Sequence, residues 1–204
     1  MTFTLVKENA AQICIDSHAA DYKGLKHVAK ILAGDILTVT GKEPEIVEQI
    51  QNVPQIVAAT KGTSDILAKW EEEKKIDLSV LEGKREVFMV QLIEEDGAEK
   101  LVIVGTETIA TLYGLYYISE NIGVSPWVYW ADVVPAPKKE IVFDKSICTV
   151  SKEPSVRYRG FFMNDEWPSL GNFVMHTFGD FNEFFYEKVF DLLLRLKGNY
   201  FWPA

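Results

Sequence analysis

The sequence predicts an α/β protein in which a domain with a mixed β-sheet is followed by a separate strand–helix–strand unit. Strand-like apolar runs alternate with helical periods over the first two-thirds of the chain. The dipeptide Asp96-Gly97 lies between two β-rich segments, which favours a hairpin and therefore one antiparallel pair within the sheet. After residue 155 a strand, a helix and another apolar segment follow one another.

The N-terminal region begins with a short apolar run at residues 12–16, which predicts a strand. Residues 22–39 place apolar side chains three and four positions apart, which predicts an amphipathic helix that ends at Gly41. Residues 54–59 predict the next strand, and Thr63 or Ser64 is the candidate N-cap of the helix after it.

The two hairpin strands are expected at residues 85–93 and 100–104, and Gly105 leads into a further helix. Gly114 inside this helix costs about 1 kcal/mol relative to Ala, so it indicates a close approach of helix to sheet. The expected apolar face of the helix consists of Ile109, Leu112, Tyr113 and Tyr116. An aromatic, proline-bounded segment, residues 126–137, precedes a last strand near residues 140–143.

We expect the domain boundary between Ser151 and Ser155, giving domains of residues 1–154 and 155–204. The second begins with a strand at residues 156–163, followed by the polar trio Asn164, Asp165 and Glu166. A loop is expected up to Asp180, which with Glu183 forms a variant of the capping box. The helix carries an apolar stripe over residues 181–196 and ends at Gly198. Because a parallel strand–helix–strand unit needs neighbours, we expect the chain to be a piece of a longer protein.

Composition excludes several classes of function. The 204 residues include 21 Lys and Arg against 30 Asp and Glu, and the net charge of −9 disfavours nucleic acid as a partner. No apolar run approaches the roughly 20 residues of a transmembrane helix, so we expect a soluble protein without a membrane partner. The first residues carry no basic head followed by a long apolar run, so we expect no signal peptide within this sequence.

The cysteine and histidine residues predict neither a metal nor a cofactor. Cys14 and Cys148 lack any metal-binding or redox spacing and are interpreted as ordinary buried thiols. His18, His27 and His176 are scattered, and no two of them have metal-ligand spacing.

Several sequence segments resemble one protein family. They are SENIGVSPW at residues 119–127, WADV at 130–133, RGFFMNDE at 159–166, FYEKVF at 185–190, LLLRLK at 192–197 and NYFWPA at 199–204. Together they resemble glycoside hydrolase family 115, which contains the xylan α-1,2-glucuronidases. The sequence departs from the family at Val128-Tyr129, where the family is more aromatic.

The resemblance implies a fold and an activity. Residues 1–154 would form a small N-terminal mixed-sheet α/β domain, and residues 155–204 would form the first β-α-β unit of a truncated (β/α)8 barrel. The parent protein would be an inverting α-glucuronidase, secreted or periplasmic, that removes glucuronic or 4-O-methylglucuronic acid from substituted xylan or its oligosaccharides. The catalytic acid and base would lie mostly beyond Ala204, leaving the fragment inactive, and a homo-oligomer stays open.

The candidate substrate-binding residues are Asn164, Asp165, Glu166, Trp202 and His176. The trio follows the first barrel strand, at the end where such barrels carry their active sites. Adjacent residues leaving a strand point to opposite sides, so Asp165 and Glu166 cannot be the two carboxyls that flank a scissile bond about 5–9.5 Å apart. Trp202 would offer a flat ring to a sugar, and His176 lies in the predicted loop.

Other interpretations remain open for each feature. The trio is also typical of a polar turn closed by local hydrogen bonds. Tyr200 and Trp202 could pack in the barrel wall, and the aromatic rings at Trp127, Tyr129 and Trp130 could be buried. A nucleotide-binding domain is disfavoured because no glycine-rich phosphate loop occurs. The alternative function is a non-catalytic carbohydrate-binding or scaffold domain.

Overall fold

The computed structural model describes residues 2–16, 22–164 and 166–203, and the chain divides into two compact units. The first comprises Met1–Ser125 and Val134–Pro154, and the second comprises Pro126–Val133 and Ser155–Ala204. The proline-bounded aromatic segment is therefore split, because its first eight residues group with the second unit.

The first unit is built on a six-stranded mixed sheet of order β3-β2-β4-β6-β5-β8. Strand β2 is parallel to β3 and β4, β4 is parallel to β6, and β5 is antiparallel to both β6 and β8. The strands are β2 (Gln12–Ile15), β3 (Ile46–Val47), β4 (Gln55–Thr60), β5 (Phe88–Glu95), β6 (Ala98–Gly105) and β8 (Thr149–Val150). This arrangement confirms the predicted mixed sheet.

The β5–β6 hairpin forms where the sequence predicts it. Asp96 and Gly97 have φ angles of 52° and 81°, so both central residues are left-handed, as the favoured two-residue hairpin turn requires. This turn fixes the register that pairs Glu95 with Ala98 and Phe88 with Gly105.

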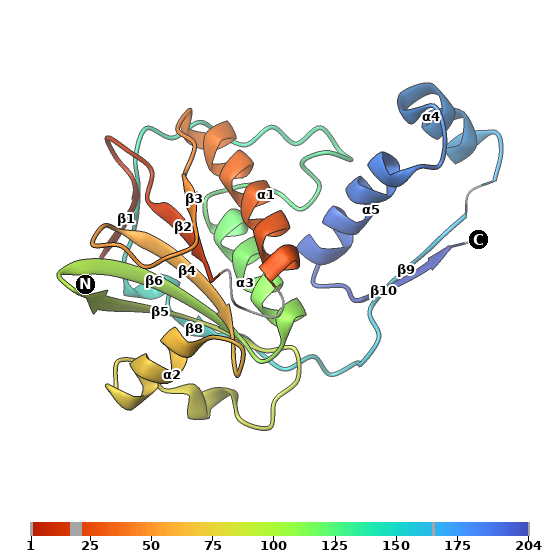
Figure 1. Ribbon diagram of the computed structural model, residues 1–204. Coiled ribbons are helices and arrows are strands. Elements are labelled where there is room, and N and C mark those ends of the chain that lie inside the picture. The colour runs from red at the N-terminus through yellow and green to blue at the C-terminus, as the bar shows by residue number, and fades with distance from the viewer. Residues whose placement is uncertain (1, 17–21, 165, 204) are drawn as a thin grey trace. The chain divides into compact units, whose positions relative to one another are not determined.

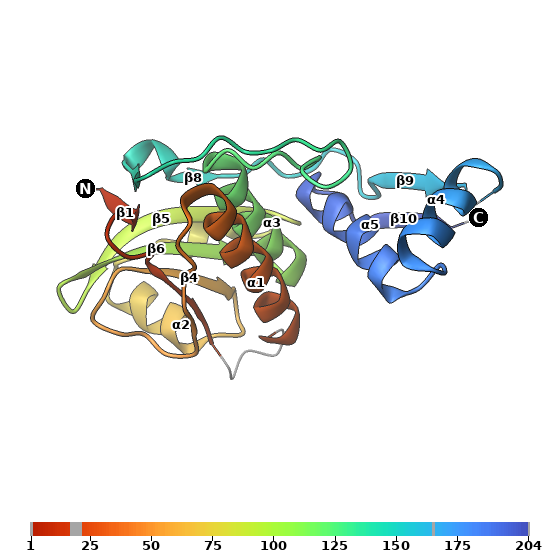
Figure 2. The same cartoon turned by 90° about the horizontal axis from the view of Figure 1, so that it is seen from above.

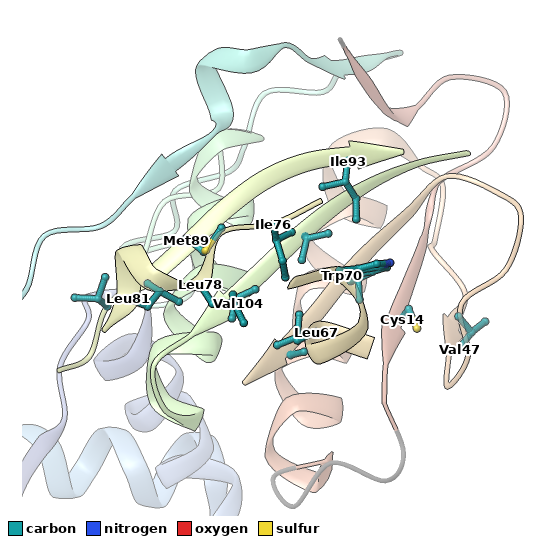
Figure 3. Packing of buried hydrophobic residues seen from close by; sticks show 14 residues of the cluster. Cys14, Val47, Leu67, Trp70, Ile76, Leu78, Leu81, Met89, Ile93 and Val104 are labelled. Atoms are coloured by element: carbon teal, nitrogen blue, oxygen red, sulfur yellow. The ribbon is translucent and has the colours of Figure 1, made fainter. Parts of the chain in front are cut away.

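Helices cover both faces of the sheet (Figures 1 and 2). α1 (Tyr22–Thr40) and α3 (Thr108–Asn121) contact each other over one face. α2 (Asp65–Glu72) and a 3-10 turn (Leu78–Leu81) lie on the other, where a buried cluster includes Cys14, Trp70 and Val104 (Figure 3). Ser64 is the N-cap of α2, but its hydroxyl donates to Asp16 Oδ2 at 3.1 Å and accepts no amide of the helix.

Gly114 marks a close approach of α3 to the sheet, as predicted. A Cβ atom at this position would overlap Cγ2 of Ile103 on β6 and lie 3.5 Å from the ring of Phe88. The predicted apolar face of α3 is partly wrong, since Ile109 and Leu112 are only half-buried. The helix contacts both the sheet and α1, so its buried residues surround the axis and do not form one stripe.

A two-stranded antiparallel ribbon joins β1 (Phe3–Val6) to β7 (Ile141–Phe143). β7 lies where the sequence predicts a strand near residues 140–143, but it is not the last strand of the first unit, because β8 follows it. None of the described helices is both long and apolar enough to cross a membrane.

The second unit contains β9 (Gly160–Met163), α4 (Ser169–Phe178), α5 (Glu183–Arg195) and β10 (Tyr200–Pro203). The two strands are parallel and pair from Gly160 with Tyr200 to Met163 with Pro203, which confirms the strand–helix–strand unit. The predicted loop up to Asp180 is wrong, because α4 forms there. Its apolar residues Leu170, Val174 and Phe178 recur every four positions and enter one buried cluster.

The N-terminus of α5 also differs from the prediction. The N-cap is Asn182, whose Oδ1 accepts the amides of Phe184 and Phe185 at 3.1 and 3.2 Å. Asp180 instead accepts the amide of Phe181 at 2.7 Å. Within the predicted stripe Phe185, Val189, Leu192 and Leu193 are buried, whereas Phe184 and Leu196 are exposed.

Candidate functional site

The β9–β10 pair has one packed face and one exposed face, and both are apolar. Phe161, Met163 and Phe201 face the helices and pack against a cluster formed by Val174, Phe185 and Val189. The opposite face carries Phe162 and Trp202, which are 58% and 60% exposed. Their rings meet edge to face, with centroids 6.1 Å apart. A sugar ring could reach the remaining surface of Trp202, because one side of the sheet is uncovered within this unit.

The polar trio begins directly after β9. Asn164 and Glu166 are both exposed, and Asn164 Oδ1 accepts the backbone amide of Glu166 at 3.2 Å. This is the local hydrogen bond of an Asx turn, so Asn164 and Glu166 are linked as in a polar turn. Asp165 lies outside the described residues. The carbonyl of Glu166 accepts the amide of Gly171 at 3.5 Å, which links the turn to α4.

Trp202 and the trio lie at the same end of the strand pair, the carboxyl end. Trp202 pairs with Phe162 and Pro203 pairs with Met163, so the Trp202 position is two residues before that of Asn164 along the parallel register. His176 lies in the last turn of α4, exposed, and not in a loop as expected. In the described part of the chain no recorded interaction joins His176 to Asn164 or Glu166.

A second feature of this unit is an aromatic cavity of about 440 Å³. Its lining residues are Tyr129, Trp130, Asp132, Ser169, Leu170 and Phe173. Trp130 is anchored, because its Nε1 donates to the carbonyl of Lys188 at 3.1 Å and its ring packs edge to face on Phe185. Trp130 is therefore partly buried, whereas Trp127 and Tyr129 are exposed and the buried interpretation is wrong for them. We define this set of six residues as the aromatic cavity.

The sequence singles out two of the six residues of this cavity. Tyr129 and Trp130 are aromatic rings of the proline-bounded segment, whereas the sequence assigns no individual role to Asp132, Ser169, Leu170 and Phe173. A helical period through Leu170, Val174 and Phe178 was the signal for α4, and with α4 in place Ser169 and Phe173 fall beside the segment.

Thiol chemistry has no support in the first unit. Burial raises the pKa of the Cys14 thiol to about 12, so this group stays protonated and is a poor nucleophile at neutral pH. Cys148 is half-buried and not fully buried as expected. Among residues 2–16, 22–164 and 166–203 no group of three or more His, Cys, Asp and Glu side chains could hold a metal ion.

Residues 151–204, which contain the trio, both strands and the helices between them, match the family described as glycosyl hydrolase family 115. A solved structure extends this similarity over both units. It is described as a novel family GH115 4-O-methyl-α-glucuronidase, BtGH115A, with specificity for decorated arabinogalactans, and it is 33% identical to this chain with a TM-score of 0.81. The chain belongs to glycoside hydrolase family 115.

The family 115 chain is short beside this relative. The match covers 99% of this chain and 26% of BtGH115A, so the chain spans about a quarter of that protein's length. A second solved structure, CpGH84D, has 12% identity and a TM-score of 0.47 over 79% of this chain and 23% of its own, which is too low to define a common fold. No curated protein matches the chain significantly. The described residues contain one parallel strand pair in the second unit and no closed barrel.

Proposed function

We propose that this family 115 chain is the N-terminal portion of an inverting α-glucuronidase. The enzyme would release glucuronic or 4-O-methylglucuronic acid from the side chains of a polysaccharide. Family membership and the 33% identity to a 4-O-methyl-α-glucuronidase support the reaction class. The main chain of the substrate is either xylan, as the sequence resemblance implies, or an arabinogalactan, since BtGH115A is described as specific for decorated arabinogalactans.

We propose further that residues 155–204 form the first strand, helical segment and second strand of a (β/α)8 barrel, after an α/β domain of residues 1–154. Helices pack on one face of the β9–β10 pair and leave Phe162 and Trp202 on the other, as for strands whose second face lines a barrel interior. The observation that carries the proposal is the trio at the carboxyl end of β9, because active sites of such barrels lie at that end.

In this proposal the chain supplies binding groups, not the complete catalytic machinery. The carboxylate of Glu166 and the amide of Asn164 would bind and orient sugar hydroxyls, with Asp165 beside them. Trp202 would stack on the sugar ring. Acid–base hydrolysis with inversion needs two carboxyls far enough apart for a water, and neighbouring residues in one turn do not provide that separation. At least one catalytic carboxyl would therefore come from outside residues 1–204.

The test is substitution of the trio in the complete enzyme that contains this chain. Asn164→Ala, Asp165→Asn and Glu166→Gln should each lower kcat/KM by about tenfold or more, about 1.4 kcal/mol, for release of 4-O-methylglucuronic acid. Glu187→Gln is the matched control, since Glu187 is an exposed acid on α5. Glucuronoxylan and decorated arabinogalactan assayed in parallel identify the main chain.

Two outcomes would contradict the proposal. If all three variants keep the parental kcat/KM, the trio is a structural turn only. If residues 1–204 alone release the uronic acid at a rate near that of the complete enzyme, the catalytic groups lie within this chain and the division of labour is wrong.

A further inference from the structure

We propose that the aromatic cavity of the second unit binds a neutral pyranose ring of the polysaccharide main chain, next to the site that binds the uronic acid. The inference rests on the proposed function for its choice of substrate class. It goes beyond that function by assigning a second binding site and the chemistry of its ligand to residues outside the trio.

The size of the cavity suits a sugar. Its volume of about 440 Å³ lies within the range of roughly 300–1,000 Å³ that is typical of small-molecule sites. Ser169, which lines it, follows Glu166 by only three residues. The α4 side of the cavity and the proposed uronate-binding turn are therefore supplied by neighbouring parts of one segment.

The apolar part of the cavity is a pair of accessible rings backed by a fixed one. Tyr129 and Phe173 are 38% and 40% exposed, so each presents ring surface to solvent. Trp130 lies between them in the packing, with its centroid 5.2 Å from that of Tyr129 and 6.1 Å from that of Phe173. Because the Trp130 indole is held by Lys188 and Phe185, the two accessible rings are pre-positioned. Aromatic faces of this kind pack on the C–H face of a pyranose.

The polar part of the cavity matches hydroxyl groups. The carboxylate of Asp132 accepts hydrogen bonds only, and the hydroxyl of Ser169 both donates and accepts. A sugar hydroxyl can donate to the first and exchange hydrogen bonds with the second. Asp132 has a φ angle of 49°, a left-handed conformation that Asp and Asn tolerate better than most residues.

The charge of the cavity favours a neutral sugar over a uronic acid. Among the six lining residues Asp132 is the acid, and its carboxylate would repel the carboxylate of a glucuronate. The Nζ of Lys188 lies 5.6 Å from the centroid of the Tyr129 ring. This ammonium group is held over the Tyr129 ring and does not line the cavity, so Asp132 is the charged group that a bound sugar would contact directly.

The experiment is a titration of the 204-residue chain followed by amide and indole NMR resonances. The probes are linear neutral xylo-oligosaccharides, neutral β-galacto-oligosaccharides and free glucuronic acid. We expect one of the two neutral series to shift the indole N–H resonance of Trp130 and the amides of residues 129–132 and 169–173. The series that binds distinguishes a xylan from a galactan main chain.

Three variants test the assignment. Tyr129→Leu should weaken neutral oligosaccharide binding about tenfold or more, because it removes one accessible ring. Asp132→Asn keeps the shape of the side chain and the left-handed backbone. It should weaken binding of the neutral oligosaccharide at least threefold and reduce the ratio of its affinity to that of glucuronic acid. Phe184→Leu is the matched control, since Phe184 is 62% exposed in the same unit and does not line the cavity. It should leave the affinity within twofold, and unchanged dispersion of the remaining resonances shows that each variant is folded.

The inference is overturned if neither neutral series shifts these resonances, if Tyr129→Leu and Phe184→Leu have equal effects, or if glucuronic acid binds at the cavity better than the neutral sugars. Its failure is distinguishable from failure of the proposed function, because the titration reads the cavity without hydrolysis. Loss of activity in the Glu166→Gln enzyme together with a silent cavity rejects the subsite alone. A responsive cavity with fully active trio variants rejects the trio alone.

Discussion

Gly160 is the residue on which the β9–β10 pair depends, and Gly160→Ala should separate the two strands. A Cβ atom at Gly160 would overlap the carbonyl oxygen of Tyr200 and lie 3.2 Å from its Cα. The obstacle is backbone, which cannot rotate away as a side chain can. To reach an ordinary carbon–oxygen contact of about 3.3 Å or more, β10 has to move away from β9 at the first of their paired positions.

The expected loss of stability follows from what that movement removes. Each backbone hydrogen bond lost between the strands costs about 0.5–1.5 kcal/mol net. Overpacking that remains after relaxation costs about 1–3 kcal/mol. We therefore expect Gly160→Ala to destabilise the second unit by about 3 kcal/mol or more. It should also move Trp202 away from Asn164 at the carboxyl end of the strand pair.

The assay is hydrogen exchange at the amides of residues 161–163 and 201–202, together with thermal unfolding. The substituted chain should lose protection in this unit while the six-stranded sheet keeps its own. Gly34→Ala is the matched control. Gly34 lies in α1, and a Cβ atom there would meet no neighbouring atom within 4 Å outside its own turn of helix. There the same substitution should be neutral or stabilise by up to about 1 kcal/mol. Equal protection and equal Tm in parent and Gly160→Ala would refute the close approach of these strands.

Two further predictions concern stability. Burial alone would raise the pKa of Glu95, but hydrogen bonds from Lys69 and Lys75 outweigh it and lower this pKa from 4.5 to about 2. The carboxylate therefore stabilises the first unit fully above about pH 4.5, and this contribution is lost as the pH falls towards 2. Glu95→Gln should cost about 1–2 kcal/mol of unfolding free energy at pH 7, a value reduced because the lysines are partly exposed. In urea denaturation measured from pH 7 down to pH 2, the variant should lose less stability on acidification than the parent. An equal loss in both would contradict the ion pairs. Asn182→Ala should destabilise α5 by about 1 kcal/mol in thermal unfolding because it removes the N-cap, whereas Asp180→Ala should cost only a few tenths; the reverse order would show that Asp180 is the cap.

Local rules predicted much of the first unit because the signals were confined to a few residues. Asp96-Gly97 fixes the hairpin through two left-handed residues. At position 114 glycine is needed because Ile103 comes so close to α3 that a Cβ atom would overlap it. The short strands β3 and β8 gave no such signal, since two residues contain no period. They form because the edges of the sheet offer them partners, which is a property of the tertiary fold.

The remaining differences arise where two local signals compete or where partners are distant in sequence. Asp180 and Asn182 are both competent N-caps, and in the structure Asn182 caps the helix whose Phe185 enters the buried cluster. Lys100 reads as an exposed charge beside a hairpin, yet it is fully buried and its Nζ donates to the carbonyls of Gln51 and Val53 at 2.7 and 2.6 Å. Those acceptors lie almost fifty residues away, so no local pattern could place them.

In the candidate site, too, some features follow from local sequence and others only from tertiary packing. The trio could be found from its place after a strand, because the carboxyl end of a strand is defined by the chain itself. The aromatic cavity could not, because it depends on α4 lying beside residues 129–132 and on Trp130 being fixed by a carbonyl of α5. A turn that is set by its own hydrogen bond, from the Glu166 amide to Asn164, holds its polar groups with little help from the rest of the unit. A cavity assembled from three segments holds its rings only while all three stay packed. The orientation of the trio should therefore survive substitutions in α4 that abolish the cavity, and this asymmetry is why the two proposed binding roles can be separated by mutation.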